Sequence, residues 1–263
     1  MLPQELAVQK ICASLKTDPF VRAVYLKGSM GRNEHDEHSD VDLYCLVDEE
    51  NEKHFMDNRL HHLQAYRPVI FKDDIFIIAP QIIAVFDNLL HIDLFTVTPE
   101  KFTEKDYFKV LYDPDNVMER FVATQSLELD ESEFRDDVID VAWFLFQYQK
   151  AAARGNGIWA VKMLSSVMDH LARVLLYKYA PERARLGLKA ISKALPAVVL
   201  LKTENIFNQM TASRHAEAAS QISKLVEEEI EWILARVAER DQIETLLRKM
   251  VEIHTRQETK RSL

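Results

Sequence analysis

Short apolar runs rich in Val, Ile, Tyr and Phe recur through the first hundred residues of the chain, and this pattern ends near residue 127. Such runs, bounded by turn residues, are typical of β-strands. Helical spacing precedes the first run and follows the second. We predict strands at residues 23–26, 41–47, 68–71, 74–79, 81–86 and 90–97, with helices near 4–15 and 50–63.

The second half of the chain has apolar residues at helical spacing. Val138, Val141 and Leu145 form one such series, and another extends from Ala160 to Val174. Residues 216–253 are predicted to form one long helix, whose apolar spacing falters after Val237. We therefore predict an α+β chain: a domain with a mixed β-sheet flanked by helices at residues 1–125, then a helical bundle domain at 126–263.

The charge is unevenly divided between these halves. Residues 1–125 contain 13 Lys and Arg against 22 Asp and Glu, whereas residues 126–263 contain 20 of each. An acidic surface repels phosphate backbones and suits a metal ion or a cationic small molecule, so we expect no nucleic acid partner. The alternative, that the acidic residues only keep the protein soluble, stays open.

The two cysteines, Cys12 and Cys45, both fall in apolar patterns. This usage is typical of a reducing compartment, where thiols pack as small hydrophobic groups. The sequence contains no apolar run long enough to span a bilayer and no signal peptide pattern. We therefore expect a cytoplasmic protein with no membrane partner.

Four of the five glycines lie in two places, and the first of these, Gly28 and Gly31, follows the predicted strand at 23–26. Glycine at the end of a strand indicates a sharp turn or a close approach of the backbone to another group. A Gly28-Ser29 turn leaves backbone N–H groups and a hydroxyl available for phosphate oxygens. The sequence therefore predicts a phosphate-binding turn here.

Asp40 and Asp42 open the next strand two positions apart, which places both carboxylates on one face. Neighbouring carboxylates repel unless a cation lies between them, and Mg²⁺ prefers such oxygen ligands. Asp93 interrupts a later apolar run and is expensive to bury without a partner. The three carboxylates predict a site for one or two Mg²⁺ ions, with Asp93 as ligand or general base.

These residues carry a resemblance. Gly28-Ser29, ten intervening residues, Asp40-Val41-Asp42 and the later Asp93 resemble the signature of the nucleotidyltransferase superfamily. More narrowly, the segment from Val85 to Asp93, with Arg154-Gly155 opening a later helix, is similar to the lincosamide nucleotidyltransferases and related aminoglycoside and other antibiotic nucleotidyltransferases. Many members have glycine where this chain has Asn33, and asparagine tolerates the same left-handed backbone.

The resemblance implies an N-terminal nucleotidyltransferase (catalytic) domain and a C-terminal helical domain for substrate binding and dimerisation. It implies that Gly28 and Ser29 bind the triphosphate of ATP or another NTP, that Asp40 and Asp42 bind magnesium, and that Asp93 is the third ligand or the base. We also expect Arg32 to contact the nucleotide. Lys150 and Lys162 could reach the triphosphate, although charged residues at a helix start are usually surface residues.

The implied reaction is the transfer of a nucleoside monophosphate from the NTP to a hydroxyl of a small molecule, with release of pyrophosphate. We expect the transferred group to be AMP. A cationic antibiotic, either a lincosamide or an aminoglycoside, fits the acidic first half, and the family implies a homodimer. Two alternatives stay open: a nucleotidyltransferase that modifies a protein or RNA partner, of the toxin–antitoxin type, and a non-catalytic nucleotide-binding module. His54, His61 and His62 lie on the predicted helix near 50–63 and are expected to face water.

Overall fold

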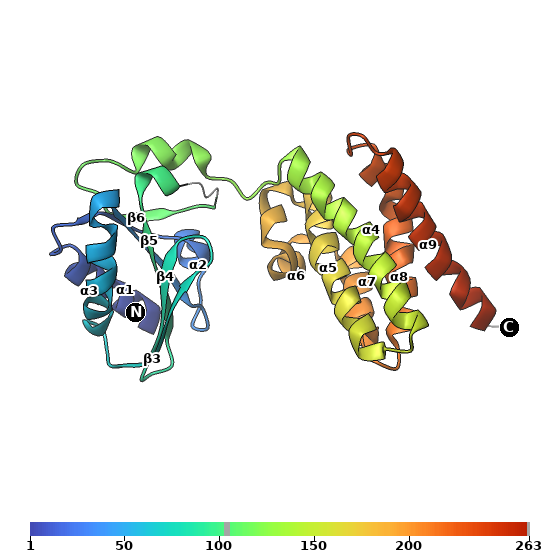
Figure 1. Ribbon diagram of the computed structural model, residues 1–263, viewed down its shortest axis with the longest axis horizontal. Coiled ribbons are helices and arrows are strands. Elements are labelled where there is room, and N and C mark those ends of the chain that lie inside the picture. The colour runs from blue at the N-terminus through green and yellow to red at the C-terminus, as the bar shows by residue number, and fades with distance from the viewer. Residues whose placement is uncertain (103–105, 262–263) are drawn as a thin grey trace. The chain divides into compact units, whose positions relative to one another are not determined.

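The computed structural model describes residues 1–102 and 106–261. The chain divides into two compact units, Met1–Ser126 and Leu127–Leu263. The first unit contains a six-stranded sheet and the second consists of helices (Figure 1). The predicted α+β class, with a mixed sheet followed by a helical region, is therefore confirmed.

The sheet has the strand order β3-β4-β5-β2-β1-β6. Its central pair, β2 and β5, is parallel, and the other neighbouring strands are antiparallel. Because a parallel pair needs a long crossover, the chain between β2 and β5 contains a helix and the β3–β4 hairpin. The strands are β1 (Val21–Leu26), β2 (Val41–Val47), β3 (Val69–Phe76), β4 (Pro80–Phe86), β5 (His91–Val97) and β6 (Lys109–Tyr112).

Two helices, α1 (Pro3–Leu15) and α3 (Glu52–Gln64), cover one face of this sheet (Figure 1). Their buried side chains, Ile11 and Phe55 among them, pack against Val24 and Leu43 of the central strands. The opposite face carries an aromatic cluster in which Tyr44 stacks on Phe95. Short helical segments complete the unit: α2 (Gly28–Gly31), η1 (Glu49–Asn51), η2 (Pro99–Lys101) and η3 (Glu119–Thr124).

The two edge strands differ from the prediction. The expected strands at 68–71 and 74–79 are one strand, β3, because Lys72, Asp73 and Asp74 continue it at the edge of the sheet, where charged side chains face water. The sequence pattern also missed β6, whose four residues pair with β1. Both errors arise because edge strands need no buried apolar run.

His62 was expected to face water and is instead buried. Its Nδ1 lies 2.9 Å from the Ser14 hydroxyl and its Nε2 lies 3.1 Å from a carboxylate oxygen of Asp18. The prediction was wrong because α1 packs against α3, so Ser14 of α1 and Asp18, just after α1, become polar partners that α3 alone does not reveal.

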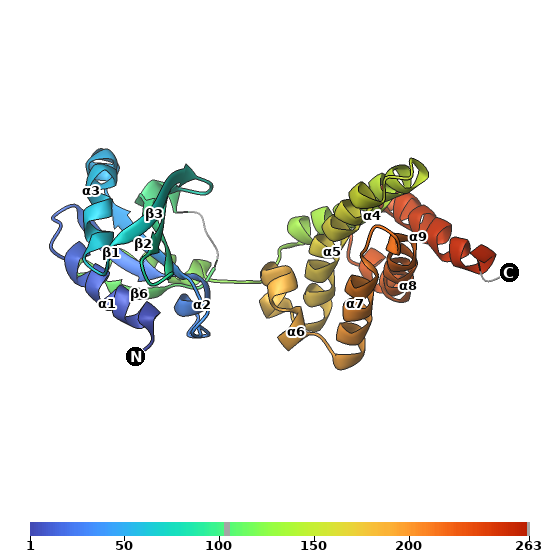
Figure 2. The ribbon, with the colours of Figure 1, turned by 90° about the horizontal axis from the view of Figure 1, so that it is seen from below.

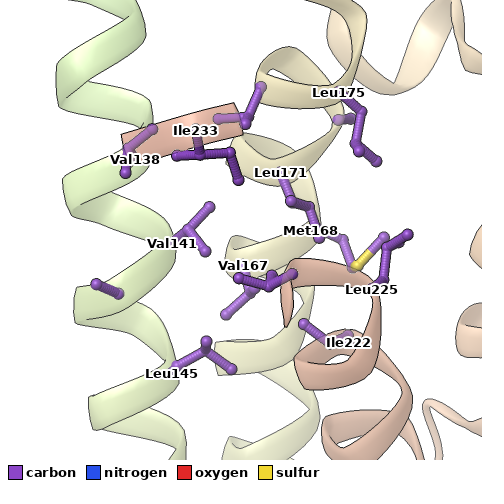
Figure 3. Close-up of a cluster of buried hydrophobic side chains, with 14 of the residues drawn as sticks. Val138, Val141, Leu145, Val167, Met168, Leu171, Leu175, Ile222, Leu225 and Ile233 are labelled. Atoms are coloured by element: carbon purple, nitrogen blue, oxygen red, sulfur yellow. The ribbon is translucent and has the colours of Figure 1, made fainter. Parts of the chain in front are cut away.

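The second unit is built around two long helices, α4 and α5, which pack against α8 and α9 (Figure 2). Val141 and Leu145 of α4 face Val167 and Leu171 of α5, with Ile222 of α8 against them (Figure 3). Its elements are α4 (Glu131–Ala153), α5 (Gly157–Tyr179), η4 (Pro181–Lys189), α6 (Ile191–Ala194), α7 (Ala197–Gln209), α8 (His215–Leu234) and α9 (Asp241–Arg261).

The single long helix expected at 216–253 is two helices, α8 and α9, so that prediction was wrong. The chain turns between them, where Glu239 has a left-handed backbone with φ of 49°. The turn lets α9 pack back against α8 and α4, which buries Leu247, Met250 and Val251. Burial of these apolar side chains outweighs the local preference for a continuous helix.

Cys12 and Cys45 are both buried, and neither forms a disulfide bond. Within residues 1–102 and 106–261, no helix has the length and apolar character required to cross a membrane.

Candidate active site

The Gly28-Ser29 turn follows directly from β1. Gly28 has a φ of +58°, which strains any residue with a side chain, and an ideal Cβ built on it would lie 1.9 Å from Oδ2 of Asp42. At Gly31 an added Cβ would lie 2.8 Å from the carbonyl oxygen of Leu26. Asn33 has a left-handed φ of 57°. This agrees with the expectation that asparagine can adopt the backbone of the glycine found here in many members of the resembling family. The turn therefore requires small residues because its backbone lies against the first strand and against Asp42.

Asp42 and Asp93 are register partners on the parallel strands β2 and β5. Both side chains are partly buried, whereas Asp40, which precedes β2, is exposed. The structure thus brings together two carboxylates that lie fifty-one positions apart in the sequence, because the crossover returns β5 to the side of β2. The backbone N–H of Lys27 donates to the carbonyl oxygen of Asp42 at 3.0 Å, which fixes the turn to β2.

His91 is a residue of this site that the sequence reasoning missed. It lies two positions before Asp93 on β5, and its Nε2 is 3.0 Å from Oδ1 of Asp93. The hydrogen bond to Asp93 raises the pKa of His91, and partial burial opposes this effect. One ligand atom each from Asp40, His91 and Asp93 lies within 4.8 Å of the others. The i, i+2 spacing of His91 and Asp93 on a strand was the available signal.

Lys27 is a second missed residue. Its side chain is buried, and Nζ lies 5.0 Å from the ring centroid of Tyr44 and 5.2 Å from that of Phe102. Burial lowers the pKa of Lys27 to about 8, although the nearby carboxylates of Asp106 and Asp42 act in the opposite direction. The ammonium therefore places positive charge beside Asp42, held by aromatic faces that attract cations.

Arg32, expected to contact a nucleotide, has two carboxylate partners in the structure. Its Nη1 lies 3.1 Å from Asp106, and its Nε lies 3.1 Å from Glu34. A phosphate at Arg32 would have to compete with both carboxylates.

The remaining predicted contacts, Lys150 on α4 and Lys162 on α5, belong to the second unit. Nζ of Lys150 lies 4.9 Å from the ring centroid of Phe146. Their assignment to the nucleotide stays a prediction.

A cavity of about 520 Å³ adjoins Asp40 and His91 and is lined by the start of α1, residues 37–40 and residues 88–91. Gln4, which is buried, shapes this cavity. Its side-chain amide donates to the carbonyl oxygens of Asp36, Glu37 and Ser39 at 3.3, 3.1 and 2.8 Å. It thereby fixes the loop that leads to Asp40. No local sequence pattern predicts this contact, because it joins residues more than thirty positions apart.

Residues 9–84 match the family model described as polymerase beta, nucleotidyltransferase. The matched segment contains the Gly28-Ser29 turn, Asp40 and Asp42, and it ends before Asp93. This segment lies within the first unit, and the match confirms the predicted resemblance to the nucleotidyltransferases.

Among solved structures, an aminoglycoside 6-adenyltransferase from Bacillus subtilis is similar at 12% identity, covering 97% of this chain and 99% of its own, with a TM-score of 0.41. A nucleotidyltransferase-like protein from Exiguobacterium sibiricum is 11% identical, with 96% and 91% covered and a TM-score of 0.39. A CD-NTase of Bradyrhizobium diazoefficiens in complex with GTP is 12% identical, with 100% and 89% covered and a TM-score of 0.28. No curated protein matches the sequence.

Proposed function

We propose that this nucleotidyltransferase transfers a nucleoside monophosphate from an NTP to a hydroxyl of a small molecule and releases pyrophosphate. AMP is the nucleoside monophosphate that we propose. The observation that carries the proposal is the packing of the Gly28 backbone against Asp42, with Asp42 in register with Asp93. This packing sets a turn able to bind phosphate oxygens beside carboxylates able to bind a cation and accept a proton.

The residues fit a divalent cation by the chemistry of their donors. Asp40 and Asp42 supply hard oxygen ligands from the start of β2, and Asp93 adds a third from β5. Bound there with the NTP, Mg²⁺ would supply positive charge for the phosphate oxygens that become more negative during transfer.

The chain's own groups then act at the reacting atoms. The Gly28-Ser29 turn, with the nearby Lys27 ammonium, holds and neutralises the phosphates. Asp93 accepts the proton of the acceptor hydroxyl while the hydroxyl oxygen attacks the α-phosphorus. The bond between that phosphorus and the leaving pyrophosphate then breaks. Asp93 is partly buried, so water has limited access to the carboxylate that takes the proton.

We propose a cationic antibiotic, a lincosamide or an aminoglycoside, as the acceptor. The acidic first unit and the acidic residues Glu37 and Asp40 at the cavity support a positively charged molecule. The same charge disfavours nucleic acid as an acceptor. A reducing compartment, the cytoplasm, is supported by the two free and buried cysteines.

The test is a transfer screen. The protein is incubated with each labelled NTP, Mg²⁺ and a panel of antibiotics, and each drug is examined by mass spectrometry for an added nucleoside monophosphate. Asp93→Asn is the matched control. If Asp93 acts mainly as the base, turnover should fall by roughly two to four orders of magnitude while Mg-NTP binding persists; if it acts mainly as a metal ligand, nucleotide affinity should fall together with turnover. Label on a protein or an RNA, with none on any drug, would instead support the alternative class of acceptor.

We also propose that the protein is a homodimer and that the helical unit contributes to acceptor binding. Exposed apolar side chains on α5 and α7, Trp159 and Val198 among them, offer a surface for association. Light scattering at micromolar concentration is expected to give twice the 30.6 kDa mass of the chain, and a monomer mass would contradict the proposal.

A further inference from the structure

The edge strand β3 is apolar as well as exposed. Among the strands that the structure describes, it has a neighbour on one side only, β4. Large apolar side chains on β3 and in the turn after it are between 55% and 72% exposed: Ile70, Phe71, Phe76, Ile77 and Ile78. An apolar edge strand offers both backbone hydrogen-bonding groups and apolar surface to another strand. β3 is therefore a surface suited to pairing with a strand from outside its own sheet.

The two faces of β3 carry different side chains. Asp74 pairs with Ile82 of β4, a core residue under α1 and α3, and Nη2 of Arg59 on α3 lies 2.7 Å from Oδ1 of Asp74. Asp74 therefore lies on the helix-covered face, and Lys72, two positions earlier, shares that face. Nζ of Lys72 lies 3.6 Å from Oδ2 of Asp74, which is longer than a hydrogen bond. The opposite face carries the alternate residues, Phe71, Asp73 and Ile75.

We infer that β3 pairs in antiparallel orientation with β3 of a second copy of this chain, with Asp73 of each copy opposite the other at the two-fold axis. Residues directly opposite each other in an antiparallel pair lie on the same face of the sheet. A two-fold axis between two identical strands must therefore pass beside one residue that faces its own counterpart. The possible centres in the charged middle of β3 are Lys72, Asp73 and Asp74.

The charges of β3 select the centre at Asp73. This centre places Lys72 opposite Asp74 of the second copy, and symmetry repeats the pair on the other side of the axis. It also places Phe71 opposite Ile75 twice, so apolar side chains meet on the other face. A centre at Lys72 or at Asp74 also puts like charges at the axis, and it sets an apolar side chain opposite a carboxylate. The strand is thus complementary in charge to its own reverse, which makes a second copy the occupant.

The regular part of β3 fits the same centre. The pairing of β3 with β4 shifts between Val69 and Phe71, so the regular ladder begins at Phe71 and ends at Phe76. The four favourable pairs around Asp73 lie within that ladder. The exposed turn residues Ile77 and Ile78 add apolar surface beside it.

This inference rests on the homodimer of the proposed function and gives it a surface in the first unit, yet it is tested without nucleotide or acceptor. The full-length Asp73→Cys variant is incubated with oxidised glutathione and run on a non-reducing gel. Opposed residues have Cα atoms about 4.5–5.5 Å apart, within the range of a disulfide. We expect a covalent dimer, and none from the wild type, because Cys12 and Cys45 are buried.

Neighbouring positions on the same strand are the matched controls. Two copies of Lys72 are offset by two residues along the strands, which puts their Cα atoms about 8 Å apart, beyond the reach of a disulfide. Lys72→Cys and Asp74→Cys are therefore each expected to give little covalent dimer alone. An equal mixture of the two is expected to cross-link, because Lys72 faces Asp74 across the axis. Circular dichroism checks that each variant is folded.

Association strength is a second readout, measured by sedimentation equilibrium on the full chain. Phe71→Asp puts a charge opposite Ile75 twice and is expected to raise the dimer Kd roughly tenfold or more. Asp73→Asn removes the like charges at the axis and is expected to lower the Kd by roughly two- to fivefold. Val110→Asp, at an exposed apolar position of the other edge strand, β6, is the control and should leave the Kd unchanged.

Absence of a covalent dimer from Asp73→Cys would overturn the inference, and so would equal cross-linking of Asp73→Cys and Lys72→Cys. A wild-type dimer whose Kd is unchanged by Phe71→Asp would leave the homodimer to the apolar side chains of α5 and α7. A wild-type monomer would exclude a second copy and leave the edge to a strand of another protein. Failure of nucleotidyl transfer is a separate result: a chain that cross-links through Asp73→Cys but modifies no acceptor would retain the pairing and lose the proposed reaction.

Discussion

Replacing Gly28 with alanine tests whether the turn is built around Asp42. The φ of +58° at Gly28 costs alanine about 1–2 kcal/mol, because its Cβ crowds the following carbonyl oxygen. That Cβ would also lie 1.9 Å from Oδ2 and 3.0 Å from Cγ of Asp42, so the carboxylate must leave its position. Displacing a side chain from its rotamer adds about 0.5–1.5 kcal/mol. We expect Gly28→Ala to lower the free energy of unfolding of the first unit by about 1.5–3.5 kcal/mol.

The assay must read the first unit alone. All three tryptophans lie in the second unit, so their fluorescence follows only that unit. Hydrogen exchange at the amides of β1 and β2 reports on the first unit, and about 1.5–3.5 kcal/mol corresponds to exchange roughly 10- to 400-fold faster. Transfer activity should fall more steeply than stability, because the displaced carboxylate belongs to the proposed site.

Two controls separate strain from collision. Gly155 has a φ of +68° and no atom within 4 Å of an ideal Cβ, so Gly155→Ala should lower the stability of the second unit by the backbone strain alone. In an Asp42→Ala background, Gly28→Ala should lose the part of its cost that comes from the carboxylate. An identical cost in both backgrounds would show that the contact with Asp42 does not restrict the turn, and the reasoning would be refuted.

The remaining predictions concern three other side chains. Asp42→Asn should abolish transfer without unfolding the chain, because losing one of several repelling carboxylates does not destabilise the metal-free fold; a lower melting temperature without Mg-NTP would instead mark Asp42 as structural. Lys27 has a folded pKa of about 8 against an ordinary 10.5, so the unfolded chain binds its proton more tightly and the metal-free first unit should gain stability as pH rises from 8 towards 10.5, by on the order of 3 kcal/mol at most; urea unfolding followed by circular dichroism should show this rise in the wild type and not in Lys27→Met. Burial lowers the pKa of His254 to about 4 from 6.5, so its contribution is complete above pH 6.5 and is lost as pH falls towards 4; tryptophan fluorescence should show the second unit losing stability there, and an equal loss in His254→Leu would contradict this assignment.

The sequence by itself determined the class of the fold and the residues of the turn that follows β1. Apolar periods of two and of three to four residues distinguish the sheet from the helical bundle, because burial of one face fixes those periods. Local chemistry also identified Gly28 and Asn33, since a left-handed backbone restricts which residues can occupy a position, and both have a positive φ.

Tertiary structure alone decided which groups meet. Asp42 and Asp93 are fifty-one positions apart, and only the parallel pairing of β2 and β5 makes them neighbours. The same pairing adds His91 to the carboxylates, and the packing of α1 brings Gln4 to the loop before Asp40. A local pattern reports the face on which a side chain lies, but contact between distant segments depends on strand order and on helix packing, which no short stretch of sequence encodes.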